Sequence, residues 1–184
     1  ATYLGVAEQT QDAAAAERAT QLALALRAPA QALAAAKIWL AAKPDEANAQ
    51  ETVDALSLLL GFDHDLGDSL LKRRQTIKTA DQLDAFYERL SGLIIRSPDP
   101  RRALSLLTRV SAQEPDHTKL LYTKAMLHEK LKEHALAEAS LRTLIRRTPD
   151  DAHALNALGY ALADRNQSLQ EAQTLLEKAH KLRP

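Results

Sequence analysis

The sequence predicts an all-α fold, a right-handed α-solenoid built from stacked helix–turn–helix hairpins. Three observations predict it: the composition, a set of regularly spaced prolines, and small residues at a fixed distance before those prolines. Hydrophobic residues make up 46% of the 184 residues, whereas aromatic residues make up only 4%. Alanine and leucine supply most of the apolar content, and both lose little side-chain entropy in a helix.

The proline spacing gives the length of the repeat. Pro115 and Pro149 lie 34 residues apart, and Pro184 follows 35 residues later. Pro44 precedes Pro115 by 71 residues, which is two repeats plus an insertion of three near Gly61. A period of about 34 residues is that of a helical-hairpin repeat. Because a proline lacks an amide donor and restricts the residue before it, a helix is expected to end at each one.

Small and acidic residues recur at fixed positions around the prolines. Twelve positions before three of them stand Ala103, Ala137 and Ala172. Two antiparallel helices pack closely only where small side chains lie at their crossing, so these alanines are expected at helix–helix contacts. Three of the prolines are followed by an aspartate that is expected to cap the next helix: Asp45, Asp116 and Asp150.

These rules divide the chain into five hairpins of one superhelical domain over residues 1–184. Their expected ranges are 12–43, 45–79, 81–114, 116–148 and 150–182. Residues 1–9 are expected to form the second helix of a preceding hairpin. The last helix carries large apolar residues where a natural end would have a polar capping helix: Leu175, Leu176 and Leu182. The chain is therefore expected to be a fragment of a longer array, with a weak homodimer through the exposed end helix.

Charge and composition exclude several classes of partner. Charged residues make up 26% of the chain and sum to a net charge of zero, so no excess of positive charge can neutralise phosphates. Nucleic acid is therefore not an expected partner. The chain has no cysteine, which removes disulfides, thiolate nucleophiles and zinc–thiolate sites. No apolar run approaches the roughly 20 residues of a membrane span, so membrane contact is expected only through an anchor outside these residues.

The sequence carries no motif of catalysis or cofactor binding. The six histidines lack the spacing of a metal site, and glycine-rich phosphate loops, G-x-S-x-G and H-E-x-x-H are absent. We therefore expect no enzyme activity, no cofactor, no metal and no small-molecule substrate. A hydrolase with an unrecognised site is the alternative outside the binding class, and turnover by the purified chain would support it.

The segment Ala154–Asn166, which reads ALNALGYALADRN, resembles a tetratricopeptide repeat. The signature positions of that repeat are taken by Leu155, Leu158, Gly159, Ala172, Leu176, Ala179 and Pro184. The preceding repeat departs from the pattern, with Lys124 and Ala125 at the Leu-Gly positions. The resemblance implies the same helical solenoid and a role in binding proteins or extended peptides on its concave face.

A narrower resemblance is carried by residues 16–50 together with the ALNALGYALADRN string. These segments are similar to a group of repeat lipoproteins of Gram-negative bacteria. Members of that group are tethered to the outer membrane, face the periplasm and act as adaptors that bring substrates to a carboxyl-terminal processing protease. The lipidated cysteine of the group is absent from this sequence. The resemblance implies a periplasmic, outer-membrane-anchored protein, and without it a soluble cytoplasmic one is expected.

In this repeat family the first helix of each hairpin lines the concave face. The positions that face the groove give these candidate protein-binding residues: Lys119, Tyr122, Met126, Lys130, Asn156 and Tyr160. Tyrosine and methionine are enriched at interfaces, and methionine adapts to varied partners. Packing of the two tyrosines between neighbouring hairpins stays the alternative interpretation.

The expected function is that of a scaffold or adaptor, which raises the effective concentration of a client near an enzyme. The alternative is an assembly factor for an envelope structure such as a pilus or a secretin, which would use the same groove.

Overall fold

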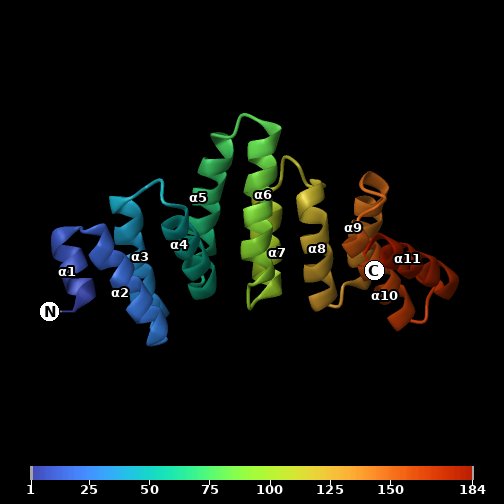
Figure 1. Ribbon diagram of the computed structural model, residues 1–184, viewed down its shortest axis with the longest axis horizontal. Coiled ribbons are helices and arrows are strands. Elements are labelled where there is room, and N and C mark those ends of the chain that lie inside the picture. Colours follow the sequence, from blue (N-terminus) through green and yellow to red (C-terminus); the bar gives the residue numbers. More distant parts are fainter. Residues whose placement is uncertain (1, 184) are drawn as a thin grey trace. The chain divides into compact units, whose positions relative to one another are not determined.

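The computed structural model describes residues 2–183, in which eleven α-helices and no β-strand occur (Figure 1). The all-α fold class is therefore confirmed. None of these described helices is long and apolar enough to cross a lipid bilayer. Their bounds are α1 (Tyr3–Thr10), α2 (Ala13–Ala25), α3 (Pro29–Ala42), α4 (Ala47–Leu60), α5 (Asp63–Gln75), α6 (Ala80–Ile95), α7 (Pro100–Val110), α8 (Thr118–Lys130), α9 (His134–Arg147), α10 (Ala152–Asp164) and α11 (Leu169–Leu182).

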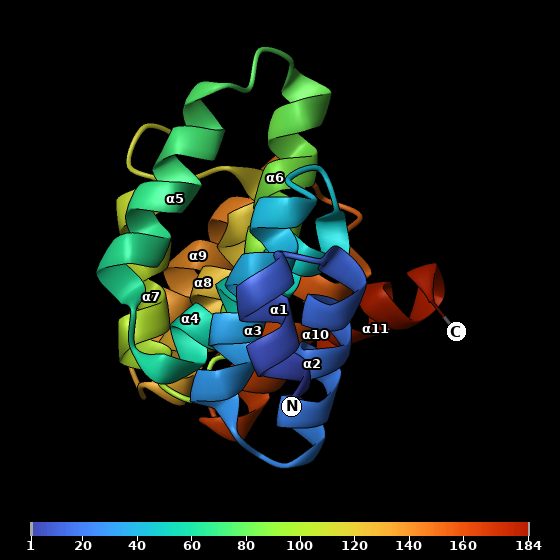
Figure 2. The same cartoon turned by 90° about the vertical axis from the view of Figure 1, so that its left-hand side faces the viewer.

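The chain divides into two compact units, residues 1–72 and 73–184, and the boundary falls inside α5. In the first unit α2 packs against α1 and α3, and α3 also packs against α4 (Figure 2). In the second unit α8 pairs with α9, α10 pairs with α11, and α6 packs against α7 and α8. Each expected hairpin range holds two helices to within one residue. Their continuation as one superhelical domain over 1–184 stays a prediction.

Three of the loops between hairpins are four-residue turns with a Pro-Asp pair at the centre. In each turn the fourth residue donates its backbone N–H to the first carbonyl at 3.1 Å, in the pairs Glu46–Lys43, His117–Glu114 and Asp151–Thr148. Proline is favoured at the second position of such a turn, because its φ is already fixed there. The aspartate consequently occupies the third turn position and lies before the helix cap.

The prediction that Asp45, Asp116 and Asp150 cap the next helices is therefore wrong. The capping residues are one position later, at Glu46, His117 and Asp151. Of these three, Asp151 caps α10 through its side chain, which accepts the backbone N–H of Ala154 at 3.0 Å.

In four of the hairpins the first helix is followed by a residue with positive φ: Arg27, Gly61, Lys132 and Asn166. In the last of these turns Ser168 also has a positive φ. The following residue bonds back across the end of the first helix. Glu133 donates its N–H to the carbonyl of His128 at 2.8 Å, and Gln167 donates to Leu162 at 2.9 Å. This is the left-handed helix ending that satisfies the last free carbonyls of a helix. It keeps each turn short, and α2 with α3, α8 with α9 and α10 with α11 lie side by side.

Alanine dominates the core of the first unit. Trp39 packs among Ala7, Ala16 and Ala49, and its indole N–H donates to Glu46 at 3.1 Å. A second cluster joins α2, α3 and α4 through Ala23, Ala32, Leu33, Ala36 and Leu56. Methyl-sized side chains let helix axes approach closely, as the sequence pattern predicts.

Leucine dominates the core of the second unit around α8 to α11. Its buried members are Leu121, Ala125, Leu141, Leu144, Ala154, Leu158, Leu162 and Ala172. The predicted small residues Ala137 and Ala172 are both buried. Gly159 explains how closely α10 approaches α11, because a Cβ added there would lie 2.7 Å from Cγ of Leu176.

A chain of ion pairs fixes α10 and α11 against the preceding hairpin. Arg165, after α10, contacts Glu129 of α8 at 3.2 Å and Glu138 of α9 at 3.3 Å. Glu138 also accepts from Arg142 at 2.8 Å, and Arg142 reaches Glu171 of α11 through two bonds of 2.6 and 3.0 Å. The alternating positive and negative charges of these ion pairs hold α8 and α10, the first helices of two successive hairpins, in register.

A buried tyrosine organises the start of α8. The Tyr87 side chain of α6 is fully buried, and its hydroxyl donates to Glu114 at 2.7 Å. Arg74 pairs with the same carboxylate. The Tyr87 ring lies 4.7 Å from the ring of His117, which contacts Asp84 at 3.1 Å. Because His117 is the N-cap of α8, this cluster sets where α8 begins.

Candidate protein-binding surface

The predicted residues of α8 form a row along one side of that helix. Tyr122 and Met126 are half-buried against the leucine core, one turn apart. Lys119 and Lys130 stand at the two ends of the row and bind α6. Nζ of Lys119 lies 3.6 Å from a carboxylate oxygen of Glu88, and Nζ of Lys130 donates to the carbonyl of Ile95 at 3.2 Å. The lysines therefore tie α8 to α6, while the tyrosine and the methionine bridge core and surface.

The predicted residues of α10 are more exposed than those of α8. The Tyr160 side chain is 62% exposed, the most of any tyrosine described, and Asn156 is exposed one turn earlier. His153 continues the row by another turn, and its ring packs edge-on against Tyr122 of α8, with ring centroids 6.4 Å apart. This contact joins the two rows. We call Tyr122, Met126, His153, Asn156 and Tyr160 the first-helix surface.

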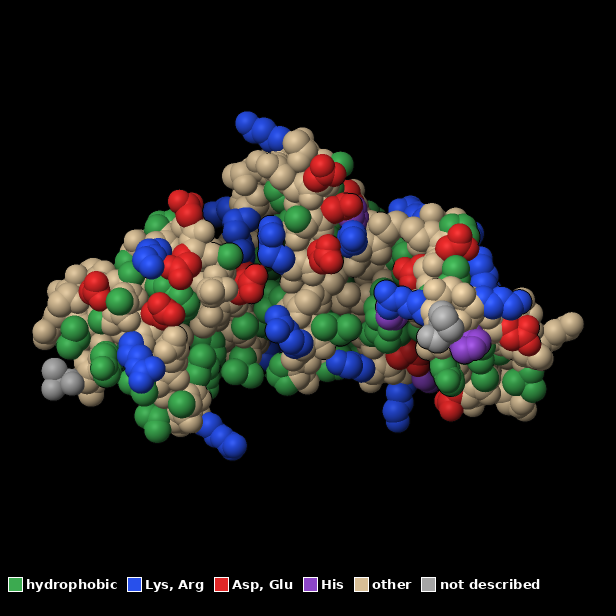
Figure 3. All heavy atoms as spheres, viewed as in Figure 1, with side chains coloured by type: hydrophobic (Ala, Val, Ile, Leu, Met, Phe, Trp, Pro, Cys, Tyr) green, Lys and Arg blue, Asp and Glu red, His purple; other side chains and the backbone are tan. Residues whose placement is uncertain are grey.

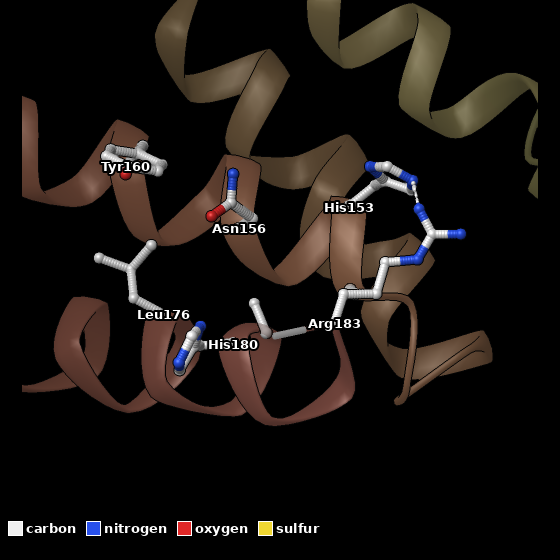
Figure 4. A pocket seen from close by; sticks show the side chains of 8 residues that line it. His153, Asn156, Tyr160, Leu176, His180 and Arg183 are labelled. Atoms are coloured by element: carbon white, nitrogen blue, oxygen red, sulfur yellow. Dashed lines mark hydrogen bonds between the residues drawn. The ribbon is translucent and has the colours of Figure 1, made fainter.

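An open pocket of about 460 Å³ lies between α10 and α11, beside the first-helix surface (Figure 4). His153, Asn156 and Tyr160 line it from α10. Leu176, Ala179, His180 and Arg183 line it from the other side. Arg183 donates through Nη1 to Nε2 of His153 at 2.8 Å, which closes the pocket at one end. In Figure 3, apolar, histidine, basic and acidic side chains lie together at the right-hand end of the view.

The α11 side of the pocket is missing from the sequence-predicted residues. Those residues came from first helices alone, whereas α11 is the second helix of its hairpin. The sequence does indicate this side of the pocket. Residues three or four apart lie on one face of a helix, as do Leu176, Ala179, His180 and Arg183. Which of the predicted binding residues contact a partner stays a prediction.

The arrangement offers binding chemistry. An exposed phenol, a carboxamide and two imidazoles surround a floor formed by Leu176 and Ala179. A carboxamide both donates and accepts, so Asn156 matches the N–H and C=O of a peptide backbone. Tyrosine supplies a large contact area at low entropic cost, and it is common among the residues that dominate interfaces.

Helices that pair in this way along the chain define the class of helical-repeat proteins. Residues 95–159 match the tetratricopeptide repeat family. This matched segment, about a third of the chain, agrees with the resemblance that the sequence carries.

One curated relative is the TPR repeat-containing protein PA4667 of Pseudomonas aeruginosa. It is 54% identical over 72 residues, which are 39% of this chain and 12% of the relative. The match thus covers a small part of a much longer protein.

Solved structures share the fold over most of the chain. YrrB has a TM-score of 0.51 and 17% identity, and the alignment covers 100% of this chain and 93% of YrrB. MamA of Desulfovibrio magneticus RS-1 has a TM-score of 0.54 and 16% identity, with 92% of this chain and 94% of that chain covered. TTC0263 of Thermus thermophilus has a TM-score of 0.51 and 21% identity, with 94% and 92% covered. At these identities the likeness concerns the fold alone.

Proposed function

We propose that this chain is a protein-interaction scaffold that holds extended peptide segments of other proteins against its first-helix surface. One observation carries the proposal: Tyr160, 62% exposed, stands beside Asn156 at the edge of a 460 Å³ pocket. Tyr160 is more exposed than the other exposed rings of the described chain, Tyr3 at 51% and Phe62 at 47%. YrrB is described as a tetratricopeptide-repeat protein with an unusual peptide-binding site, which supports the same role for a chain of this fold.

The test is Tyr160→Ala, with Leu136→Ala as its matched control. Leu136 is a large apolar side chain of the same unit that is 53% exposed, and it lies outside the pocket. Overlapping peptides that tile an unfolded protein, spotted on an array, provide the probes, and fluorescence anisotropy gives the dissociation constants of those that bind. Loss of an anchor costs about 2 kcal/mol, or roughly thirtyfold in Kd. Only Tyr160→Ala should show it, and equal binding by all three proteins would refute the proposal.

Tyr122→Ala is a less suitable test of binding than Tyr160→Ala. Tyr122 packs against Leu-rich core residues, so its truncation is expected to lower both the affinity and the stability of the fold. Circular dichroism on the same samples separates the two effects. A loss of helical signal with unchanged affinity would assign Tyr122 to the core alone.

At a finer level, we propose that the scaffold delivers bound clients to a periplasmic carboxyl-terminal processing protease. Support comes from the lipoprotein-like segments of the sequence and from the relative in Pseudomonas aeruginosa, a Gram-negative bacterium. An adaptor of this kind acts by raising the effective concentration of client near the enzyme. The rate of client cleavage at a concentration below Kd should therefore rise when the scaffold is added. Peptide binding without faster cleavage would favour the assembly-factor alternative.

The location of the protein is part of the same proposal. An outer-membrane-anchored periplasmic protein should sediment with outer membranes and be released by detergent. Fractionation of cells that make the full-length protein, followed by immunoblotting, is the measurement. Recovery in the cytosolic fraction would contradict the periplasmic proposal and leave peptide binding untouched.

A further inference from the structure

The contact between Arg183 and His153 is unusual for a basic side chain of this unit. A guanidinium has hydrogens to donate and no lone pair to accept with, so Nε2 of His153 is the acceptor of the 2.8 Å bond. The arginine thus bonds a ring nitrogen and not a carboxylate. Within residues 2–183, no carboxylate forms an ion pair with Arg183, His153 or His180.

Two other arginines from α9 onward have carboxylate partners, whereas Arg146 bonds a hydroxyl and Arg147 a backbone carbonyl. Arg142 binds Glu138 and Glu171, and Arg165 binds Glu129 and Glu138. Three acidic residues beside the pocket in sequence are engaged elsewhere. Glu177, next to Leu176, accepts from Nε2 of Gln173 at 2.8 Å. Asp150 pairs with Lys178 at 2.9 Å, and Asp151 accepts the N–H of Ala154 at 3.0 Å. The positive charge of Arg183 thus lies at one end of a pocket without a matching negative charge from the described chain.

The pocket has a second, apolar end at a defined distance. Tyr160 lies seven residues beyond His153 on α10, which is about 10 Å along the helix axis. Leu176 lies on the opposite helix near Tyr160, as Figure 4 shows. An extended peptide advances about 3.3 Å per residue, so two or three of its residues span about 7 to 10 Å. The two ends of the pocket therefore match side chains that lie two or three residues apart in an extended peptide.

We propose that this pocket selects extended peptides that carry an acidic side chain two or three residues from an apolar one. The inference rests on the proposed peptide-binding function and names the class of peptide. The apolar side chain packs against Tyr160 and Leu176, and Asn156 bonds the intervening backbone. Arg183 turns from Nε2 of His153 to the carboxylate, since a charge-assisted bond to a carboxylate is stronger than a hydrogen bond to a ring nitrogen.

The experiment uses two series of labelled host peptides rich in glycine and serine. Each peptide contains one leucine and one glutamate separated by zero to five residues, and its partner has glutamine in place of glutamate. Anisotropy titrations compare the unsubstituted chain with Arg183→Gln. Lys181→Gln is the matched control, because Lys181 is an exposed cation on the same last turn of α11 that does not line the pocket.

We expect the glutamate peptide to bind roughly tenfold more tightly than its glutamine partner at the two favoured spacings, as a charge-assisted bond implies. Arg183→Gln should abolish that difference, and Lys181→Gln should keep it. Equal binding of glutamate and glutamine peptides would overturn the acidic preference and leave the proposed function standing. An acidic preference without any spacing dependence, or one lost equally in Lys181→Gln, would also overturn it. Failure of every peptide to bind would instead overturn the proposed function.

Discussion

Gly159 lies where α10 crosses α11, and its lack of a side chain sets the distance between these helices. A Cβ at this position would meet Cγ of Leu176 at 2.7 Å and the backbone oxygen of Ala172 at 3.1 Å. The leucine could move, but the backbone oxygen belongs to a packed helix. Gly92, on α6, is the natural contrast, because a Cβ there would meet nothing within 4 Å.

We therefore predict opposite effects for the same substitution at the two glycines. Gly159→Ala should lower the free energy of unfolding by about 1–3 kcal/mol through overpacking, less the helix-propensity gain of alanine. Gly92→Ala should raise it by up to about 1 kcal/mol, because only the propensity gain applies. Urea unfolding followed by circular dichroism gives both values. A destabilised Gly92→Ala protein would contradict the assignment of that site as open.

Glu114 is a second residue whose surroundings make a measurable prediction. Burial raises the pKa of its carboxyl group, but the hydrogen bonds from Tyr87 and Arg74 and the charge of Arg74 outweigh burial and lower that pKa below its ordinary value. The ionised carboxylate is thus favoured in the folded state. Its contribution to stability is present above the ordinary pKa of 4.5 and is lost as the pH falls through the lower native value.

Glu114→Gln should therefore reduce the acid sensitivity of the fold. The difference in unfolding free energy between neutral and acidic solution should be smaller in this variant than in the unsubstituted chain. Glu177→Gln is the control, since Glu177 is exposed on α11 and bonds only Gln173 among the described contacts, at 2.8 Å. An unchanged pH dependence in Glu114→Gln would show that the cluster around Tyr87 does not depend on the charge of this carboxylate.

At the scale of elements, α9 and α11 are joined by the bidentate pair of Arg142 and Glu171. The hydrogen bonds to Glu171 raise the pKa of Arg142, and the same bonds lower the pKa of Glu171. Both side chains remain more than a third exposed, so solvent and salt screen their attraction. We therefore expect a modest coupling, about 0.5–1 kcal/mol.

A double-mutant cycle with Arg142→Met and Glu171→Gln measures this coupling free energy. It should fall in high salt, because the pair is screened there. Arg146→Met provides the control, since the exposed Arg146 donates to Thr143 at 2.8 Å and reaches no carboxylate among the described contacts. A coupling that salt does not alter would mean that packing of the arginine stem, and not charge, joins the two helices.

The elements were predictable from sequence to the extent that local rules determine them. Pro44 and Pro149 located the ends of α3 and α9, because proline acts on the residues beside it. Pro115 did not locate the end of α7, which ends at Val110. The caps were displaced by one position, since a Pro-Asp pair also fits the middle of a turn and the turn's hydrogen bond decided the register. The α11 side of the pocket was missed, because Arg183 reaches His153 only after two helices have packed together.

At the scale of the whole molecule, residues 1–72 and 73–184 have separate buried clusters. The periodic pattern of hydrophobic residues did not predict this division, because the pattern continues through α5, where the boundary between the units lies. Repeat proteins derive stability from contacts between neighbours, so damage to one cluster is expected to act locally. Leu158 belongs to the core of the second unit and Leu56 to that of the first.

Hydrogen exchange measured by mass spectrometry should reveal this locality. Leu158→Ala should speed amide exchange mainly in 73–184, and Leu56→Ala mainly in 1–72, each by a local loss of about 2–5 kcal/mol. The two variants serve as controls for each other. A uniform rise over the whole chain in both would indicate one cooperative domain over 1–184, as the sequence first suggested.

The alanine-dominated packing of the first unit has a mechanical consequence. Trp39 is surrounded there by methyl groups, whereas leucine side chains interlock between α8 and α11. Each methyl contact contributes little dispersion energy, so smooth alanine faces resist shear less than interlocked leucines do. In an optical trap that stretches the chain, residues 1–72 should give way at the lower force and 73–184 at the higher. Under tension, the two units would then unfold one after the other, residues 1–72 before residues 73–184.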